Sequence, residues 1–98
     1  MGSRDEVLSD LREHLQTIRK FGVRRLGLFG SIARNEGSAE SDLDFLVELE
    51  HDNFDAYMDL KFFLEDLFQC SVDLVMADTV KPRLRSDILK ETVYVAGL

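Results

Sequence analysis

The chain between Gly27 and Glu50 runs GLFGSIARNEGSAESDLDFLVELE, and the other elements can be placed around this stretch. The apolar run from Leu26 to Phe29 predicts a buried strand, and the Gly30-Ser31 pair after it predicts a tight turn into the first turn of a helix. A polar loop follows, and a second strand is predicted to run from there to Leu49. The sequence therefore predicts two strands joined by a turn, a short helix and a loop.

Two carboxylates stand near the start of the second strand. Asp42 and Asp44 are two residues apart, so strand alternation projects both from the same face. At about 4 Å their repulsion is roughly 1 kcal/mol in water and about 4 kcal/mol at an effective dielectric near 20. Mg²⁺ suits such a pair, because it binds one or two carboxylates and fills its other positions with water and phosphate oxygens.

The Gly30-Ser31 turn has the features of a phosphate site. Glycine allows the backbone to approach a ligand closely, and a following helix presents unpaired N–H groups at its positive end. The Ser31 hydroxyl is one more donor.

The spacing of these residues resembles the signature of a known family. Residues 30–34 follow the pattern GSxAR, six residues intervene, and residues 41–44 follow the pattern SDxD. This combination resembles the DNA polymerase beta-like nucleotidyltransferases, and it is most similar to the minimal nucleotidyltransferase (MNT) branch, the antitoxin-type proteins encoded beside HEPN-domain toxins. The resemblance covers nearly the whole chain, and it implies a palm-type nucleotidyltransferase core.

Asp73 is the lone charge inside the apolar strand predicted over Ser71–Met76. Taken by itself, it suits a structural aspartate and a site residue equally well, because a charge in such a strand needs a partner. The resemblance implies that Asp73 completes a metal site with Asp42 and Asp44. In that reading the three carboxylates hold two Mg²⁺ ions and are the catalytic residues, and Asp73 accepts the proton of the attacking hydroxyl.

The resemblance also implies a set of nucleotide-binding residues, namely Gly30, Ser31, Arg34 and Ser41. For Arg34 the alternative is a solvated arginine that pairs with Glu36 or Glu40.

The implied activity is transfer of AMP from ATP to a tyrosine of a cognate HEPN toxin, which would make the chain an antitoxin able to form a hetero-oligomer with the toxin. Two alternatives remain. The chain could neutralise the toxin by binding alone, or it could modify a small molecule as the antibiotic nucleotidyltransferases do. No residue is an evident reader of the base.

Length and composition narrow the class of protein. Residues 1–98, with 45% hydrophobic residues, are expected to form a single domain. The net charge of −7 argues against direct binding to nucleic acid, which needs a basic surface. The lone cysteine, Cys70, suits a reducing compartment, and no apolar run is long enough for a membrane span, so a cytoplasmic location is expected.

The remaining elements complete an α/β (α+β) pattern, in which helices and strands alternate to give a mixed β-sheet with flanking helices. An N-terminal helix carries Leu8, Leu11, Leu15 and Ile18 at helical spacing, with His14 beside this stripe as a surface or boundary residue. A helix over Asn53–Gln69 is predicted to bury one broad face that includes Phe54, whereas Phe62 falls outside that face.

A third helix is predicted around Pro82, with Asp78 or Thr79 as its cap, and a short strand is predicted over Thr92–Val95. The third helix includes the densest basic group of the chain, which is either ordinary helix charge or a contact for a triphosphate or an acidic partner. That group consists of Lys81, Arg83 and Arg85.

Overall fold

The computed structural model describes residues 4–34, 42–51 and 53–98. The elements in chain order are α1 (Arg4–Glu13), α2 (Leu15–Lys20), β1 (Val23–Phe29), α3 (Gly30–Ala33), β2 (Leu43–Leu49), α4 (Phe54–Phe68), β3 (Val72–Met76), the 3₁₀ helix η1 (Ala77–Thr79), α5 (Pro82–Glu91) and β4 (Val93–Tyr94). None of the helices in these residues has both the length and the apolar character needed to span a bilayer.

The four strands form one mixed sheet in the order β3-β2-β1-β4. β1 pairs antiparallel with β2 and with β4, whereas β2 and β3 are parallel. A parallel pair needs a crossover connection, and α4 provides it between β2 and β3. The predicted α/β (α+β) architecture with a mixed sheet and flanking helices is confirmed.

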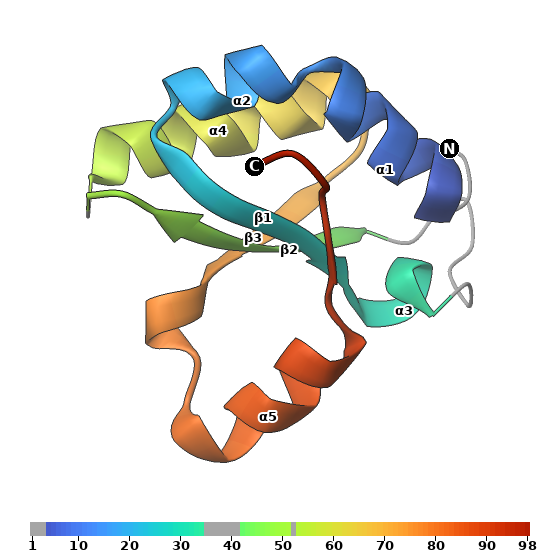
Figure 1. The fold of residues 1–98 in the computed structure, drawn as a ribbon, viewed down its shortest axis with the longest axis vertical. Coiled ribbons are helices and arrows are strands. Elements are labelled where there is room, and N and C mark those ends of the chain that lie inside the picture. Colours follow the sequence, from blue (N-terminus) through green and yellow to red (C-terminus); the bar gives the residue numbers. More distant parts are fainter. Residues whose placement is uncertain (1–3, 35–41, 52) are drawn as a thin grey trace.

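The two faces of the sheet are covered very differently. Helices α1, α2 and α4 lie against one face, and α5 lies beyond the opposite face (Figure 1). No residue of α5 is buried, and its apolar side chains Leu84 and Leu89 are 47% and 39% exposed. The face toward α5 is therefore the less covered one, although Leu46 of β2 is buried on it, and we call it the open face.

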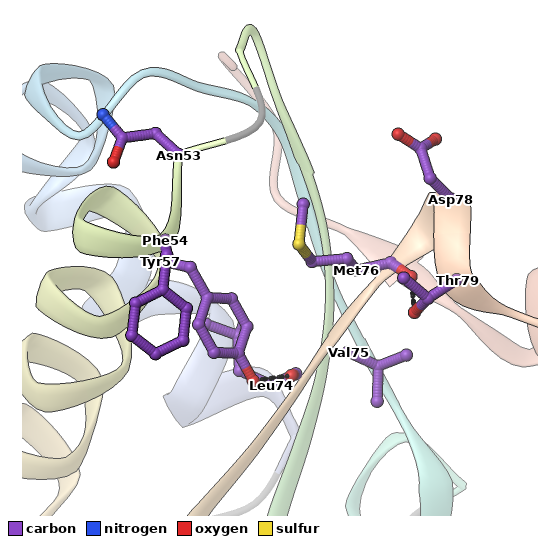
Figure 2. A pocket seen from close by; sticks show the side chains of 8 residues that line it. All are labelled: Asn53, Phe54, Tyr57, Leu74, Val75, Met76, Asp78 and Thr79. Carbon is purple, nitrogen blue, oxygen red and sulfur yellow. Dashed lines mark hydrogen bonds between the residues drawn. The ribbon is translucent and has the colours of Figure 1, made fainter.

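The strand β3 lies at one edge of the sheet, and side chains of α4 cover part of that edge. The Tyr57 hydroxyl donates a hydrogen bond of 2.6 Å to the carbonyl oxygen of Leu74 (Figure 2). The Glu65 carboxylate accepts one of 3.2 Å from the backbone N–H of Val72. Such contacts protect an edge strand from pairing with other chains.

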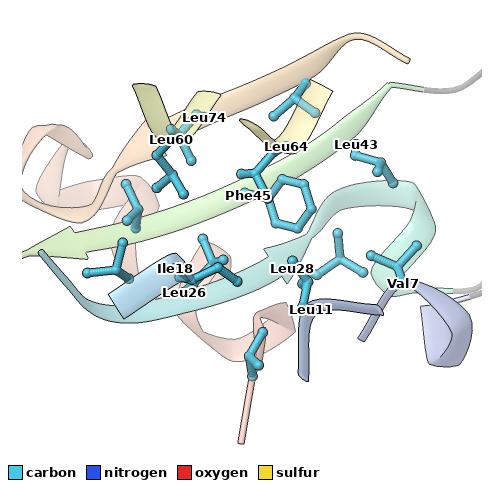
Figure 3. Packing of buried hydrophobic residues seen from close by; sticks show 14 of the residues in the cluster. Val7, Leu11, Ile18, Leu26, Leu28, Leu43, Phe45, Leu60, Leu64 and Leu74 are labelled. Carbon is cyan, nitrogen blue, oxygen red and sulfur yellow. The ribbon is translucent and has the colours of Figure 1, made fainter. Parts of the chain in front are cut away.

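The hydrophobic core fills the space between the sheet and the three helices on its covered face (Figure 3). Its fully buried side chains include Val7, Leu11, Ile18, Leu26, Leu28, Leu43, Phe45, Leu60 and Leu64. In β2 the core residues Leu43 and Phe45 flank Asp44, so strand alternation directs Asp44 to the open face.

The helix α4 begins and ends as predicted. The Asn53 side chain accepts hydrogen bonds from the backbone N–H groups of Asp55 and Ala56, and Gln69 ends the helix in the left-handed conformation with φ 53°. Phe62 is 57% exposed, outside the apolar face as predicted. Phe54 is 73% exposed, so its predicted burial is wrong; it lies in the first turn and stacks on Tyr57 instead of reaching the core.

The N-terminal helix is broken into two at His14. The backbone leaves helical geometry there, with φ −114° and ψ 20°. Nδ1 of His14 lies 2.8 Å from the carbonyl oxygen of Asp10, and the ring packs edge-on against Phe63. His14 therefore has a structural role.

The cap of α5 also differs from the prediction. Lys81 occupies the N-cap position and Pro82 begins the helix, whereas Asp78 and Thr79 lie in η1. Proline at the first helical position needs no N–H partner, so α5 starts there without a side-chain cap.

Candidate functional site

Asp44 lies beside two other predicted parts of the site, Asp73 and the Gly30 turn. In the sheet register its neighbour on β1 is Phe29, and its neighbour on β3 is Asp73. Because paired residues of adjacent strands direct their side chains to the same face, Asp44 and Asp73 lie side by side on the open face. Phe29 is the last residue before the Gly30 turn, so the same register brings that turn to Asp44.

Gly30 packs directly against the Asp44 side chain. Its φ is +79°, a left-handed conformation that side chains disfavour. A Cβ atom at this position would overlap with Oδ2 of Asp44. Both the backbone conformation and this close approach therefore require glycine.

The electrostatics of the site are dominated by negative charge. Burial raises the pKa of the Asp44 carboxyl, and the nearby charge of Asp73 raises it further. Asp42 and Glu91 add contributions of the same sign, whereas the Arg34 guanidinium acts in the opposite direction. A cation bound among these carboxylates would relieve their repulsion.

Glu91 is a site residue that the sequence interpretation did not include. It is the last residue of α5, and its Oε1 accepts a hydrogen bond of 3.2 Å from the backbone N–H of Gly30. Its Oε2 lies 2.8 Å from Nη1 of Arg34 and forms a salt bridge with it. Arg34 thus has a carboxylate partner, but from α5; Glu36 and Glu40, the predicted partners, lie outside the described residues.

The other predicted site residues are less constrained. Ser31 is half-buried in α3, and Asp42 is exposed immediately before β2. Ser41 lies outside the described residues. The register thus brings together Gly30, Asp44 and Asp73, while the charges of Asp42 and Arg34 act on Asp44 from nearby.

The donors suit Mg²⁺ by their chemistry. Aspartate carboxylates are the hard oxygen ligands that this ion prefers, and the pKa of Asp44 is raised first by burial and then by the neighbouring carboxylates. Within residues 4–34, 42–51 and 53–98, however, no three His, Cys, Asp or Glu side chains are positioned to hold a metal ion.

A cavity of about 610 Å³ lies elsewhere, between the start of α4 and the end of β3 (Figure 2). Its lining is mostly apolar and includes Phe54, Tyr57, Leu74 and Met76. None of the predicted site residues lines it, so it is separate from the carboxylate cluster.

Comparison with known proteins identifies relatives over almost the full length of the chain. Residues 8–95 match the family described as "Nucleotidyltransferase domain". Over 93 residues the chain is 39% identical to the protein adenylyltransferase MntA of Thermococcus cleftensis, an alignment that covers 93% of this chain and 94% of the relative.

Solved structures share the fold. A protein described as a minimal nucleotidyltransferase matches with a TM-score of 0.82 and 32% sequence identity, covering 94% of this chain and 95% of that one. A complex of tri-AMPylated Shewanella oneidensis HEPN toxin with MNT antitoxin matches with a TM-score of 0.66 and 18% identity, covering 94% of this chain and 73% of the matched one. At 18% identity this second likeness concerns the fold alone.

Proposed function

The chain belongs to the nucleotidyltransferase domain family, and from this membership we propose that it is an antitoxin that transfers AMP from ATP to a tyrosine of a HEPN-domain toxin. The transfer class agrees with the relative named protein adenylyltransferase. The toxin as acceptor is supported by the complex of an AMPylated HEPN toxin with an MNT antitoxin, whose fold this chain shares.

The register around Asp44 is the observation that carries the proposal. One strand places Asp73 beside it, and the other places the Gly30 turn against it. A turn able to approach a phosphate therefore lies next to carboxylates able to bind a cation, as transfer from a nucleoside triphosphate requires.

The carboxylates would hold the metal. We propose that Asp42 and Asp44 bind two Mg²⁺ ions and that Asp73 is a ligand of one of them. When bound, the ions would neutralise phosphate charge and stabilise the oxygens that enter and leave the α-phosphorus.

The turn would hold the triphosphate. The Gly30 backbone N–H, the Ser31 hydroxyl and the Arg34 guanidinium are donors for phosphate oxygens, and Arg34 can bind two of them at once. Ser41 is proposed to bind the nucleotide as well, because it is the first residue of the SDxD pattern.

The reaction would proceed by in-line displacement. The acceptor hydroxyl oxygen forms a bond to the α-phosphorus while the bond from that phosphorus to the bridging oxygen breaks, and pyrophosphate leaves. The hydroxyl proton passes to the Asp73 carboxylate. The open face suits a macromolecular acceptor, because α5 lies over this face without burying any of its own residues.

The proposal also covers the partner of the chain and its cellular compartment. The net charge of −7 supports a protein partner over a nucleic acid, and the single thiol, Cys70, supports a reducing cytoplasm. We expect a hetero-oligomer with the toxin and no association with membranes.

The test is to co-express the chain with the product of the adjacent gene and to incubate the purified proteins with Mg²⁺ and ATP. Intact-mass spectrometry should show AMP added to the toxin, and the Asp42→Asn/Asp44→Asn double variant should add none. A stable, inhibited complex without added mass would favour inhibition by binding alone. An adjacent gene unrelated to HEPN proteins, together with transfer to a small hydroxyl compound, would favour the other alternative.

A further inference from the structure

The Glu91 carboxylate occupies the place that an anion would take at the Gly30 turn. One of its oxygens accepts a hydrogen bond from the Gly30 backbone N–H, and the other binds the Arg34 guanidinium. A backbone N–H and a guanidinium are also the groups that typically bind a phosphate.

The pairing of β4 with β1 holds the end of α5 near the Gly30 turn. In the antiparallel pairing of β1 with β4, Gly27 pairs with Tyr94 and Leu28 pairs with Val93. Gly30 directly follows β1 and Glu91 lies two residues before β4, so this pairing keeps the two segments close. The sheet therefore brings Glu91 near the turn, and the Glu91 side chain makes the contact.

We infer that Glu91 is a built-in competitor of the nucleotide, whose carboxylate must leave the Gly30 N–H and Arg34 before a phosphate can bind there. The inference rests on the proposed function, because it takes the Gly30 turn as the triphosphate site. It adds that the affinity for ATP is limited by a residue of this chain.

The structure indicates that the carboxylate can be displaced. The side chains of Arg34 and Glu91 are 46% and 29% exposed, and a solvent-accessible ion pair of this kind is weak. The helix that carries Glu91 buries none of its residues, so a small shift of its last turn exposes little apolar surface. A phosphate carries more charge than a carboxylate and can make the same hydrogen bonds.

A role for Glu91 in positioning Arg34 would have the opposite effect on ATP affinity. If Glu91 instead positioned Arg34 for the nucleotide, its removal would weaken ATP binding. If Glu91 competes, Glu91→Gln removes the charge while keeping the size, and ATP should bind about three- to tenfold tighter, as expected for the loss of one nearby negative charge.

A matched control is available on the same sheet. Glu48 forms a salt bridge of 3.5 Å with Arg25, and its side chain is 35% exposed. Glu48→Gln therefore removes one negative charge and one glutamate–arginine pair away from the turn, and ATP affinity should remain within about twofold of the wild type, since screening weakens distant surface charges.

The experiment is isothermal titration of Mg²⁺-ATP into the wild type, Glu91→Gln and Glu48→Gln, after thermal unfolding has established that each is folded. Should Glu91→Gln not fold, Glu91→Asp serves instead, because its shorter side chain withdraws from Gly30 and should also tighten binding. Tighter binding only in the Glu91 variant supports the inference. Unchanged or weaker binding in that variant, beside a wild type that binds ATP, overturns the inference alone. Absence of binding by every folded protein overturns the proposed nucleotide site as well.

Discussion

Gly30 is the residue on which the geometry of the site depends most directly, because it has a left-handed backbone and contacts Asp44. We predict that Gly30→Ala lowers the free energy of unfolding by about 1–2 kcal/mol from backbone strain. Displacement of the Asp44 side chain by the new methyl group should add to this loss. Denaturant unfolding measures this effect.

Gly22 is the matched control for that substitution. Its φ is +80°, nearly the same as that of Gly30, but a Cβ atom there would have no neighbour within 4 Å. Gly22→Ala should therefore cost only the strain, about 1–2 kcal/mol. If the two variants lose equal stability, the contact between Gly30 and Asp44 is of no energetic consequence.

Asp44 is predicted to destabilise the metal-free fold. Its pKa is raised by burial and by neighbouring carboxylates, so its charged form is less favourable in the folded than in the unfolded state. In EDTA at neutral pH, Asp44→Asn should be more stable than the wild type by on the order of 1 kcal/mol. Mg²⁺ at about 100 times its dissociation constant should stabilise the wild type by roughly 2.7 kcal/mol and the variant much less. Thermal unfolding with and without Mg²⁺ is the measurement, and equal shifts in both proteins would remove Asp44 from the metal site.

The pH dependence gives an independent check. An aspartate whose pKa is raised on folding destabilises the fold fully above the folded pKa, and this penalty disappears below the ordinary value of about 3.9. The advantage of Asp44→Asn in EDTA should therefore shrink as the pH falls from neutral toward about 4. An advantage that is independent of pH would mean that the carboxylate charge is not its source.

Among the elements, α4 is the one whose limits follow most directly from the sequence. Asn53 caps its first turn through two hydrogen bonds of 2.9 and 3.2 Å. Asn53→Ala should lower the free energy of unfolding by about 0.5–2 kcal/mol, while Asn53→Asp should stay close to the wild type because it keeps an acceptor oxygen. Urea unfolding of the three proteins would disprove the cap if both variants were equally destabilised.

The elements also show where interpretation of the sequence stops. Local patterns predicted the strand over Asp44, the turn at Gly30 and the strand over Asp73, because each has its own periodicity or turn residue. The placement of Glu91 depends on β4, a strand of two residues that pairs with a segment more than sixty positions earlier. No local pattern encodes such a pairing, so Glu91 was missed.

At the scale of the whole molecule, the apolar residues are divided unequally between the two faces of the sheet. The pattern of the sequence predicted that α4 packs on the core, whereas α5 leaves its apolar side chains Leu84 and Leu89 exposed. A helical pattern predicts a helix without saying which surface it meets. The open face is consequently known only from the structure, and it is the face that carries Asp44 and Asp73.

The carboxylates at the open face are predicted to contribute differently to ATP affinity and to the rate of AMP transfer. Asp73 is both a proposed metal ligand and the proposed proton acceptor, whereas Asp42 and Asp44 remain to bind a cation without it. Asp73→Asn should therefore keep most of its ATP affinity and lose most of its transfer rate. Asp44→Asn should lose both. The loss of one metal ligand is expected to cost several kcal/mol at the transition state, where each 1.36 kcal/mol is about tenfold in rate.

Two measurements separate these effects: titration of Mg²⁺-ATP, and the rate at which AMP appears on the co-purified toxin by intact mass. The matched control is Asp59→Asn, an exposed aspartate of α4, on the covered side of the sheet, which should change neither quantity. A transfer rate in Asp73→Asn equal to that of the wild type would exclude Asp73 from the reaction. Equal losses of binding and rate would mean that Asp73 acts only through the metal, because removal of a proton acceptor alone lowers the rate while ATP remains bound.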